Sequence, residues 1–356
     1  MSLLEKLKKN STIKDTAILA KSKFFAAKDM IQTHIPAINV ALSGDLEGGF
    51  TPGLTMFAGP SKHFKTAFSL LLAKAYQEKY KDSVVLFYDS EFGTPQNYFS
   101  SFEIDINRVI HTPITDVEQL KFDIMQQLSN IDRDDHVIIV VDSIGNLASK
   151  KEVEDALDQK SVSDMTRAKQ IKSLFRMVTP HLTLKDIPMI VVNHTYMEIG
   201  MFPKAIVGGG GGTYYSSDNI FIIGRQQEKE GQEIVGFNFI INVEKSRYVR
   251  EKAKIPITVR FDGGISHYSG LLDMALESGH VTKPNVGWYA KVNTLTGEVD
   301  SKKWRLADTE CPEFWNSILE NESFKEWVRK NYQFSSTLAN NSTTIGENQN
   351  DESSDE

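Results

Sequence analysis

The chain has 356 residues, of which 40% are hydrophobic and 24% charged, an ordinary composition for a globular protein. Its longest uninterrupted aliphatic run, Val137 to Val141, is far too short to span a bilayer. The charged N-terminus, Met1 to Asn10, has no apolar signal-peptide core. A single cysteine, Cys311, excludes an intramolecular disulfide and fits a reducing cytoplasm.

The charge of the chain is unevenly distributed along its length. The formal net charge is -7, and five of the acidic residues lie after Ser335, where there is no Lys or Arg. The rest of the chain is therefore close to neutral and can still hold a local basic groove. The composition therefore neither excludes nor supports DNA binding.

The order of the expected elements predicts an α/β fold with a mostly parallel sheet. Residues Thr12 to Phe25 are expected to form one amphipathic helix, followed by a connector through His34 and Pro36. From Leu54 on, short aliphatic runs alternate with helical stretches, and the last runs follow one another as hairpins would. The runs are Leu54–Ala58, Val84–Tyr88, Val137–Val141, Met189–Val192, Ile220–Ile223, Phe237–Val243 and Ile255–Phe261.

The end of the chain divides into two further parts. Beyond Gly270 the pattern predicts a small α/β lobe, which contains Trp304, Trp315 and Trp327. Residues after Tyr332 are rich in Ser, Asn and Thr and poor in apolar side chains, which predicts a disordered acidic tail.

The strongest local signal is a glycine- and lysine-containing loop between an expected strand and an expected helix. This context is typical of a P-loop, in which backbone N–H groups at a helix N-terminus bind phosphates. Lys65 would then reach the β- and γ-phosphates of a nucleotide, and the Thr66 hydroxyl would bind Mg²⁺. The usual glycine before the lysine is Phe64, so its side chain must point away from the nucleotide or the loop must shift. The loop consists of Gly59, Pro60, Ser61, Lys62, His63, Phe64, Lys65 and Thr66.

Three further strands end in polar residues that suit nucleotide hydrolysis. The buried run before Asp142 resembles a Walker B strand, which ends in a Mg²⁺-binding acid. Glu91 follows the run Val84–Tyr88 and is our choice for the residue that activates water, since Asp89 is expected to turn the chain there. His194 follows the fourth run and is placed to sense the γ-phosphate. The glycines Gly208–Gly212 close the next loop and predict that it becomes ordered only on binding.

Together these segments resemble the RecA family of recombinases, and within it the recombinases of T-even-like phages. The resemblance covers about Ile13 to Tyr332. It implies an N-terminal oligomerisation arm (1–35), a RecA-like ATPase core (36–270), a small C-terminal domain (271–334) and a tail (335–356). The segments that carry it are Gly59–Thr66, Tyr88–Gly93, Val141–Leu147, Asn193–Tyr196, Val243–Arg247 and Phe261–Ile265.

The resemblance implies an ATP site that is shared between subunits. Tyr98 and Tyr268 match the aromatic residues that pack against adenine. Lys245 and Arg247 match the cations that reach the ATP of a neighbouring subunit. His194 stands where the family has a glutamine that senses the γ-phosphate. ATP and Mg²⁺ are the implied cofactors, and a helical filament of the chain is the implied assembly.

The resemblance also implies DNA partners. Two loops, Glu154–Thr166 and Thr195–Thr213, fall where the family binds DNA. Phosphate pairing and apolar wedging between bases suit single-stranded DNA of any sequence. The implied partners are single-stranded DNA, homologous duplex DNA, a single-strand-binding protein and a loading mediator. The candidate contacts are Arg167, Met201, Phe202, Gly208 and Gly209.

Three alternatives stay open at this point. A hexameric RecA-fold DNA helicase would share the ATPase core, but about 35 residues before the core leave little room for its usual extra domain. A passive coat or regulatory protein would use ATP only as a structural ligand, against which the full set of catalytic residue types argues. A small-molecule kinase would need an acceptor-binding lid, and nothing in the sequence resembles one.

Overall fold

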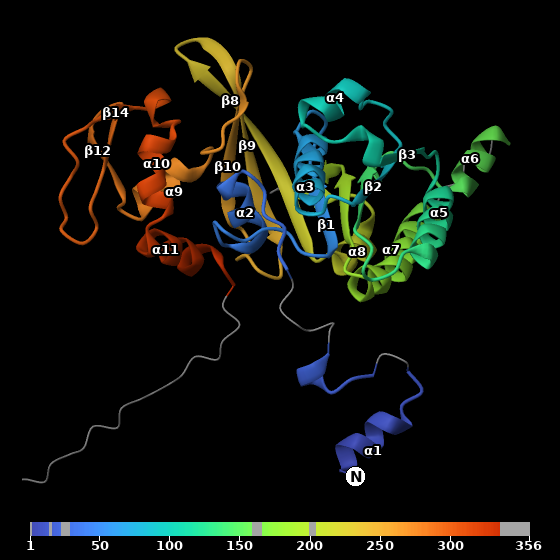
Figure 1. The fold of residues 1–356 in the computed structure, drawn as a ribbon. Helices are drawn as coiled ribbons and strands as arrows, with labels where there is room; N and C mark the ends of the chain where they lie inside the picture. The colour runs from blue at the N-terminus through green and yellow to red at the C-terminus, as the bar shows by residue number, and fades with distance from the viewer. Residues whose placement is uncertain (1, 14–15, 23–28, 159–165, 199–203, 335–356) are drawn as a thin grey trace, which may run out of the picture.

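The computed structural model describes residues 2–13, 16–22, 29–158, 166–198 and 204–334. At its centre lies a nine-stranded sheet with strand order β11-β10-β9-β8-β1-β5-β4-β2-β3 (Figure 1). The strands of this sheet are β1 (Gly53–Ala58), β2 (Val84–Asp89), β3 (Val109–Pro113), β4 (Val137–Asp142), β5 (Pro188–Asn193), β8 (Asn219–Glu230), β9 (Glu233–Lys245), β10 (Lys254–Arg260) and β11 (Gly264–Ile265).

The strands from β8 to β3 run parallel, whereas β9, β10 and β11 are added antiparallel at the other edge. Every residue of β1, β4 and β5 is buried, which explains why these strands consist mainly of Val, Ile, Leu and Met. The α/β fold with a mostly parallel sheet, predicted from the sequence, is confirmed.

Helices cover both faces of the sheet. On one face, α2 (Pro36–Ser43) and α3 (Lys65–Lys79) contribute to an apolar cluster that includes Phe57 and Phe68. On the other face, α5 (Val117–Asn130) and α7 (Thr166–Leu184) form a second cluster around Ile124 and Phe175. The central strands β1, β4 and β5 are therefore covered on both sides, whereas β3 and the distal halves of β8 and β9 carry exposed polar residues.

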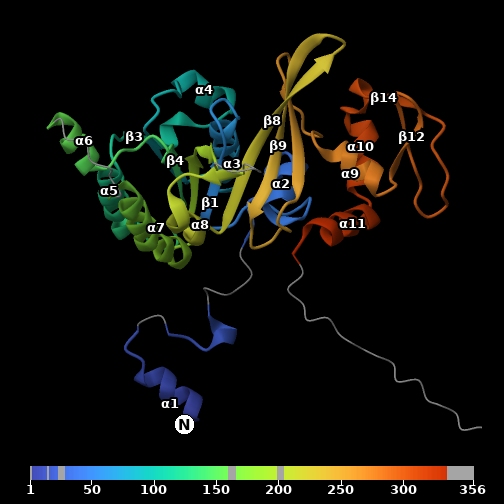
Figure 2. The ribbon, with the colours of Figure 1, turned by 180° about the vertical axis from the view of Figure 1, so that it is seen from behind.

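A small lobe follows the sheet, as the sequence predicts. It combines a three-stranded sheet with three helices, and Trp315 and Phe324 are buried with the α2 and α3 side of the core. Ion pairs from Lys325 to Glu47 and from Arg329 to Asp45 connect it to the turn after α2. Figures 1 and 2 show this lobe and helices α5 and α7 at opposite ends of the molecule. The lobe's elements are α9 (Leu271–Glu277), β12 (Val281–Asn285), β13 (Trp288–Lys291), β14 (Trp304–Arg305), α10 (Pro312–Leu319) and α11 (Glu322–Tyr332).

The N-terminal helix lies earlier than predicted. The helix α1 spans Leu3–Asn10, whereas the described part of Thr12 to Phe25 contains only one 3₁₀ turn, Leu19–Lys21. The Ser11 hydroxyl accepts from the Ile13 N–H and bonds to the Thr16 hydroxyl, so local side-chain bonds compete there with a helix. The predicted helix over Thr12–Phe25 is wrong. No side chain of α1 is buried.

The glycine-rich loop is more ordered than predicted. Described residues of this segment form a two-stranded hairpin, β6 (Thr195–Met197) with β7 (Ala205–Val207), and the helix α8 (Gly210–Ser216). A side chain at Gly212 would collide with Lys172 of α7, so close packing against α7 orders a sequence with poor helix propensity. The expectation that Gly208–Gly212 lack order without a ligand is therefore wrong. The tail from Ser335 lies outside the described residues.

Two short helices follow strands of the parallel part of the sheet, and Phe99 of the first is buried in the core. They are α4 (Gln96–Ser101), after β2, and α6 (Lys150–Leu157), after β4. No described helix has the length and apolar character that a membrane span needs.

Candidate nucleotide-binding and hydrolysis site

The carboxyl ends of four neighbouring strands, β1, β2, β4 and β5, lie at the same end of the sheet. Asp89 of β2 pairs in register with Asp142 of β4, and Ala58 of β1 pairs with Asn193 of β5. The residues that follow these strands therefore surround one cavity of about 380 Å³. The cavity is lined by Ser61, Lys62, His63, Phe64, Lys65, Thr66, Ala67, Glu91, Gly93, Thr94, Tyr98, Asp142, Val192 and His194.

The predicted P-loop connects β1 to α3, as its sequence context requires. The helix α3 has no side-chain cap at its N-terminus, so its first N–H groups are available to an anion. Lys65 is 6% exposed, and its Nζ donates to the Pro60 carbonyl over 2.7 Å. Burial lowers the pKa of Lys65, against the opposing effect of Glu91 and Asp142. A phosphate group in the cavity would give this buried ammonium a stronger acceptor.

The structure explains the phenylalanine in the P-loop. Phe64 has a left-handed backbone with φ of 62°, a conformation that costs a non-glycine residue about 1 kcal/mol. Its ring stacks on Phe239 of β9 with a centroid distance of 4.9 Å and meets Phe68 edge-on at 5.5 Å. Such aromatic pairs contribute about 1 kcal/mol each beyond their burial, enough to offset the backbone cost. The ring packs against the core, which is the first of the two arrangements expected from the sequence.

Thr66 and Asp142 form the part of the site that suits a divalent cation. The Thr66 hydroxyl donates to Asp142 Oδ2 over 2.7 Å, and Asp142 Oδ1 is buried without a hydrogen-bond partner among the described residues. Burial raises the pKa of Asp142 to about 6. Hard oxygen donors of this kind fit Mg²⁺, which commonly takes one carboxylate, one hydroxyl and phosphate oxygens. The described residues hold no group of three His, Cys, Asp or Glu side chains that could bind a metal by themselves.

Glu91 and His194 approach each other across the cavity. His194 Nε2 lies 3.2 Å from Glu91 Oε1, and this hydrogen bond is the main reason why the pKa of Glu91 is lowered. Asp89 accepts from the N–H groups of Glu91 and Phe92, so it turns the chain as expected from the sequence. A Cβ atom at Gly145 would lie 2.3 Å from His194 Cδ2, so the His194 position depends on a glycine there.

The two predicted adenine contacts are placed differently. Tyr98 lines the cavity, whereas Tyr268 stacks at 6.0 Å on Trp315 of the C-terminal lobe and is not among the lining residues. A second cavity of about 550 Å³ is lined by Phe64, Tyr98 and Ile265 among others. The rings of Phe64, Tyr98 and Phe102 in its partly polar walls suit a purine base. Ile265 was not identified from the sequence as a site residue, because an aliphatic side chain carries no chemical signal.

The predicted DNA contacts are brought together only in part. Arg167 donates to the carbonyls of Leu147, Ile144 and Gly145, so its guanidinium holds the loop after β4. Gly208 donates its N–H to the His194 carbonyl over 2.9 Å, and Gly209 is the left-handed N-cap of α8. Met201 and Phe202 lie outside the described residues, as does part of the first loop. DNA contact by these residues stays a prediction.

Lys245 and Arg247 lie away from this cavity, near the start of β1. Lys245 Nζ donates to the carbonyls of Tyr214 and Ser217 at the end of α8. Arg247 pairs with Asp218, whose carboxylate accepts from the Leu54 N–H. The P-loop follows the opposite end of this six-residue strand, about 16 Å away at 3.3 Å per residue.

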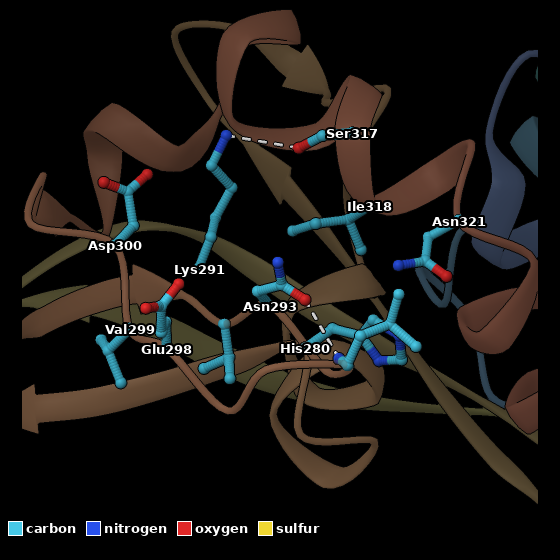
Figure 3. A pocket seen from close by; sticks show the side chains of 11 residues that line it. His280, Lys291, Asn293, Glu298, Val299, Asp300, Ser317, Ile318 and Asn321 are labelled. Atoms are coloured by element: carbon cyan, nitrogen blue, oxygen red, sulfur yellow. Dashed lines mark hydrogen bonds between the residues drawn. The ribbon is translucent and has the colours of Figure 1, made fainter.

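A third cavity, of about 750 Å³, lies in the C-terminal lobe (Figure 3). Lys291 Nζ there bonds to the Ser317 hydroxyl and the Glu313 carbonyl. Both ring nitrogens of the buried His280 bond to hydroxyls, those of Ser278 and Ser323. These groups are satisfied within the lobe, and the cavity has no cluster of side chains suited to phosphate or to catalysis.

Comparison with known proteins identifies the family. The family model described as RecA N-terminal domain matches residues 5–266, more than half of the chain. The chain belongs to the RecA family. A second model, described as the C-terminal domain of the bacteriophage T4 recombination and repair protein, matches residues 268–328 of this RecA-family recombinase.

Individual RecA-family relatives agree with this assignment. The recombination and repair protein of Enterobacteria phage T4 is 51% identical over 342 residues, which cover 95% of this chain and 88% of the relative. The RecA protein of Bacteroides thetaiotaomicron is 26% identical over 274 residues, covering 76% of this chain and 80% of the relative. The predicted membership of the RecA family, and similarity to the recombinase of a T-even phage, are confirmed.

The close approach of Gly145 to His194 predicts the effect of Gly145→Ala. The new methyl group would displace the imidazole from Glu91, so we expect ATP hydrolysis to slow at least about tenfold with ATP affinity nearly unchanged. The measurement is steady-state ATPase activity beside ATP binding. Gly224→Ala in β8 is the matched control, since a Cβ there makes no contact closer than 3.5 Å and Gly224 does not line the cavity. Equal slowing by Gly145→Ala in a His194→Ala background would contradict the explanation.

The buried Asp142 predicts a pH-dependent gain in stability for Asp142→Asn without nucleotide or Mg²⁺. The carboxyl would lose its proton near pH 3.8 when unfolded and near pH 6 when folded, so the folded state binds more protons between these values. The parent protein therefore loses stability from this group as pH rises through that window. We expect the variant's advantage in free energy of unfolding to grow to about 3 kcal/mol above pH 6. Urea unfolding at pH 4 and pH 7.5 measures it, and an advantage of equal size at both would contradict the assignment.

Proposed function

We propose that this RecA-family recombinase exchanges DNA strands as a filament on single-stranded DNA and hydrolyses ATP with Mg²⁺ at the cavity between β1, β2, β4 and β5. The observation that carries the proposal is the joint placement of four side chains around one cavity. Thr66 bonds to Asp142 and Glu91 bonds to His194, beside the N-terminus of α3. This arrangement combines phosphate binding, cation binding and a candidate base in one place.

Each side chain has a role that follows from its position. Lys65 would exchange the Pro60 carbonyl for a β- or γ-phosphate oxygen and stabilise charge on the transferred group. Thr66 and Asp142 would hold Mg²⁺, which neutralises phosphate charge when bound. Glu91 would orient the attacking water and accept its proton, because its lowered pKa keeps it ionised at neutral pH.

His194 would connect the nucleotide to the DNA-binding loops. Its imidazole contacts Glu91, and its backbone carbonyl accepts from Gly208 at the base of the glycine-rich segment. Loss of the γ-phosphate could therefore change the position of α8, which begins one residue after Gly209. The base of the nucleotide would occupy the second cavity against Tyr98 and Ile265.

Lys245 and Arg247 would serve the ATP of a neighbouring subunit. Within one chain they lie at the far end of β1 from the P-loop, which supports an action in trans. Each cation would stabilise the transferring phosphoryl group of the neighbour, as an arginine finger does. Such a head-to-tail contact is heterologous and generates an open filament when the rotation does not close.

The proposed partners are single-stranded DNA, homologous duplex DNA and further copies of the chain. A single-strand-binding protein and a loading mediator are proposed as accessory partners. Because the 51% identical relative belongs to a bacteriophage, we propose that the chain acts in the cytoplasm of a bacterial host.

ATP hydrolysis with and without single-stranded DNA tests the proposal. Lys65→Ala should abolish hydrolysis, because the transferred group loses its main charge partner. Glu91→Gln should bind ATP and DNA yet hydrolyse at least about a hundredfold more slowly, since only water activation is lost. Hydrolysis by Glu91→Gln at the parent rate would show that the carboxylate is not the base and would move that role to Asp89.

Mixing two inactive variants tests the shared site. Lys65→Ala retains the cations, and Lys245→Ala/Arg247→Ala retains the P-loop. Random head-to-tail assembly of equal amounts joins a good P-loop to good cations at about a quarter of interfaces. DNA-dependent ATPase activity should return to at most about that fraction of the parent rate. A mixture that binds DNA but stays inactive would show that the cations act in cis or are structural.

A further inference from the structure

Phe64 occupies a position that connects the P-loop to the core of the sheet. Its ring stacks nearly parallel on Phe239, with an interplanar angle of 18°, and meets Phe68 at 85°. Both partners are buried, Phe239 at 4% exposure and Phe68 at 0%. Two buried rings that pack against the Phe64 side chain therefore stabilise the left-handed backbone of this residue.

The same residue lies where two cavities adjoin. Phe64 and Tyr98 line both the cavity at the P-loop and the cavity of about 550 Å³ beside it. Phe239 lines neither of them. A change at Phe239 would therefore affect a bound nucleotide indirectly, and its ring contact with Phe64 leads directly to the P-loop.

We propose that Phe64 is a positioning residue, whose stacking on Phe239 and Phe68 holds the P-loop in its nucleotide-binding shape before the nucleotide arrives; this rests on the proposed ATP site. A glycine at this position would visit left- and right-handed conformations about equally and would have to be ordered on binding. With phenylalanine at this position, the backbone is already ordered when the core folds, so nucleotide binding does not bear the entropy cost of ordering it. Affinity for ATP then depends on how the ring of Phe64 packs on Phe239 and Phe68.

Three substitutions in the full-length chain distinguish the effect of the Phe64 ring from the effect of its left-handed backbone on ATP binding. Phe64→Ala removes the ring but keeps the Cβ atom that disfavours a left-handed backbone, whereas Phe64→Gly removes both. Phe239→Leu removes the stacking partner and leaves the P-loop sequence intact. Phe175→Leu is the matched control, because Phe175 is a fully buried ring in the cluster on the opposite face of the sheet.

ATP affinity with Mg²⁺ is measured by calorimetry without DNA, and kcat and KM are measured with single-stranded DNA. We expect Phe64→Ala to weaken ATP binding about tenfold, equivalent to about 1.4 kcal/mol, and Phe64→Gly and Phe239→Leu about threefold. KM should rise in parallel while kcat stays within about twofold, since Lys65, Glu91 and Asp142 are unchanged. Phe175→Leu should lower the thermal midpoint but leave ATP affinity at the parent value.

Two results would overturn the inference. Parent-like ATP affinity in Phe64→Ala and in Phe239→Leu would show that the stack does not position the loop. Equal weakening by Phe175→Leu and Phe239→Leu would show a general loss of stability instead. If Phe64→Ala does not fold, the comparison of Phe239→Leu with Phe175→Leu decides alone. Failure of the parent to bind ATP, or binding undiminished by Lys65→Ala, would instead contradict the proposed function.

Discussion

The hydrogen bond between Thr66 and Asp142 connects the two halves of the site. It joins the first turn of α3 to the end of β4, through two residues that are 76 positions apart in the chain. Because β4 and β2 pair in register, fixing Asp142 also fixes the chain that leads to Glu91. The bond leaves the second Asp142 oxygen buried and without a partner among the described residues, which is an arrangement that a cation would stabilise.

The two carboxylates of the site have opposite environments. Asp142 is almost fully buried, and its pKa rises to about 6. Glu91 is one-third exposed and bonds to His194, so its pKa falls below the usual value. At neutral pH Glu91 is a stable anion that can accept a proton, whereas Asp142 depends on a nearby positive charge. Divergent pKa values of this kind would suit the roles proposed for Glu91 as a base and for Asp142 as a cation ligand, although both residues are acids.

The sequence predicted the elements whose signal is local. The aliphatic run of Val137–Asp142 identifies a buried strand, and the polar residue after such a strand identifies a site residue. The edge strand Val109–Pro113 was missed, because it is half-exposed and contains polar residues. The helix Gly210–Ser216 depends on packing against α7, which no local pattern reveals. The orientation of Phe64 was likewise open, since its stacking partner Phe239 is 175 residues later in the chain.

The contacts of Lys245 set a condition on any action between subunits. Its ammonium has three hydrogens, and it donates to three carbonyls, those of Tyr214, Tyr215 and Ser217. These are carbonyls at the C-terminus of α8, where a positive charge stabilises the helix. A phosphate on a neighbouring subunit could gain this ammonium only if α8 gave up at least one of these bonds. The glycines at the start of α8 give that helix a low intrinsic stability. The helix would therefore be less stable when Lys245 donates to another group in place of its carbonyls. If Lys245 acts on a neighbour's phosphate as proposed, that phosphate and the carbonyls at the end of α8 would compete for the same ammonium group.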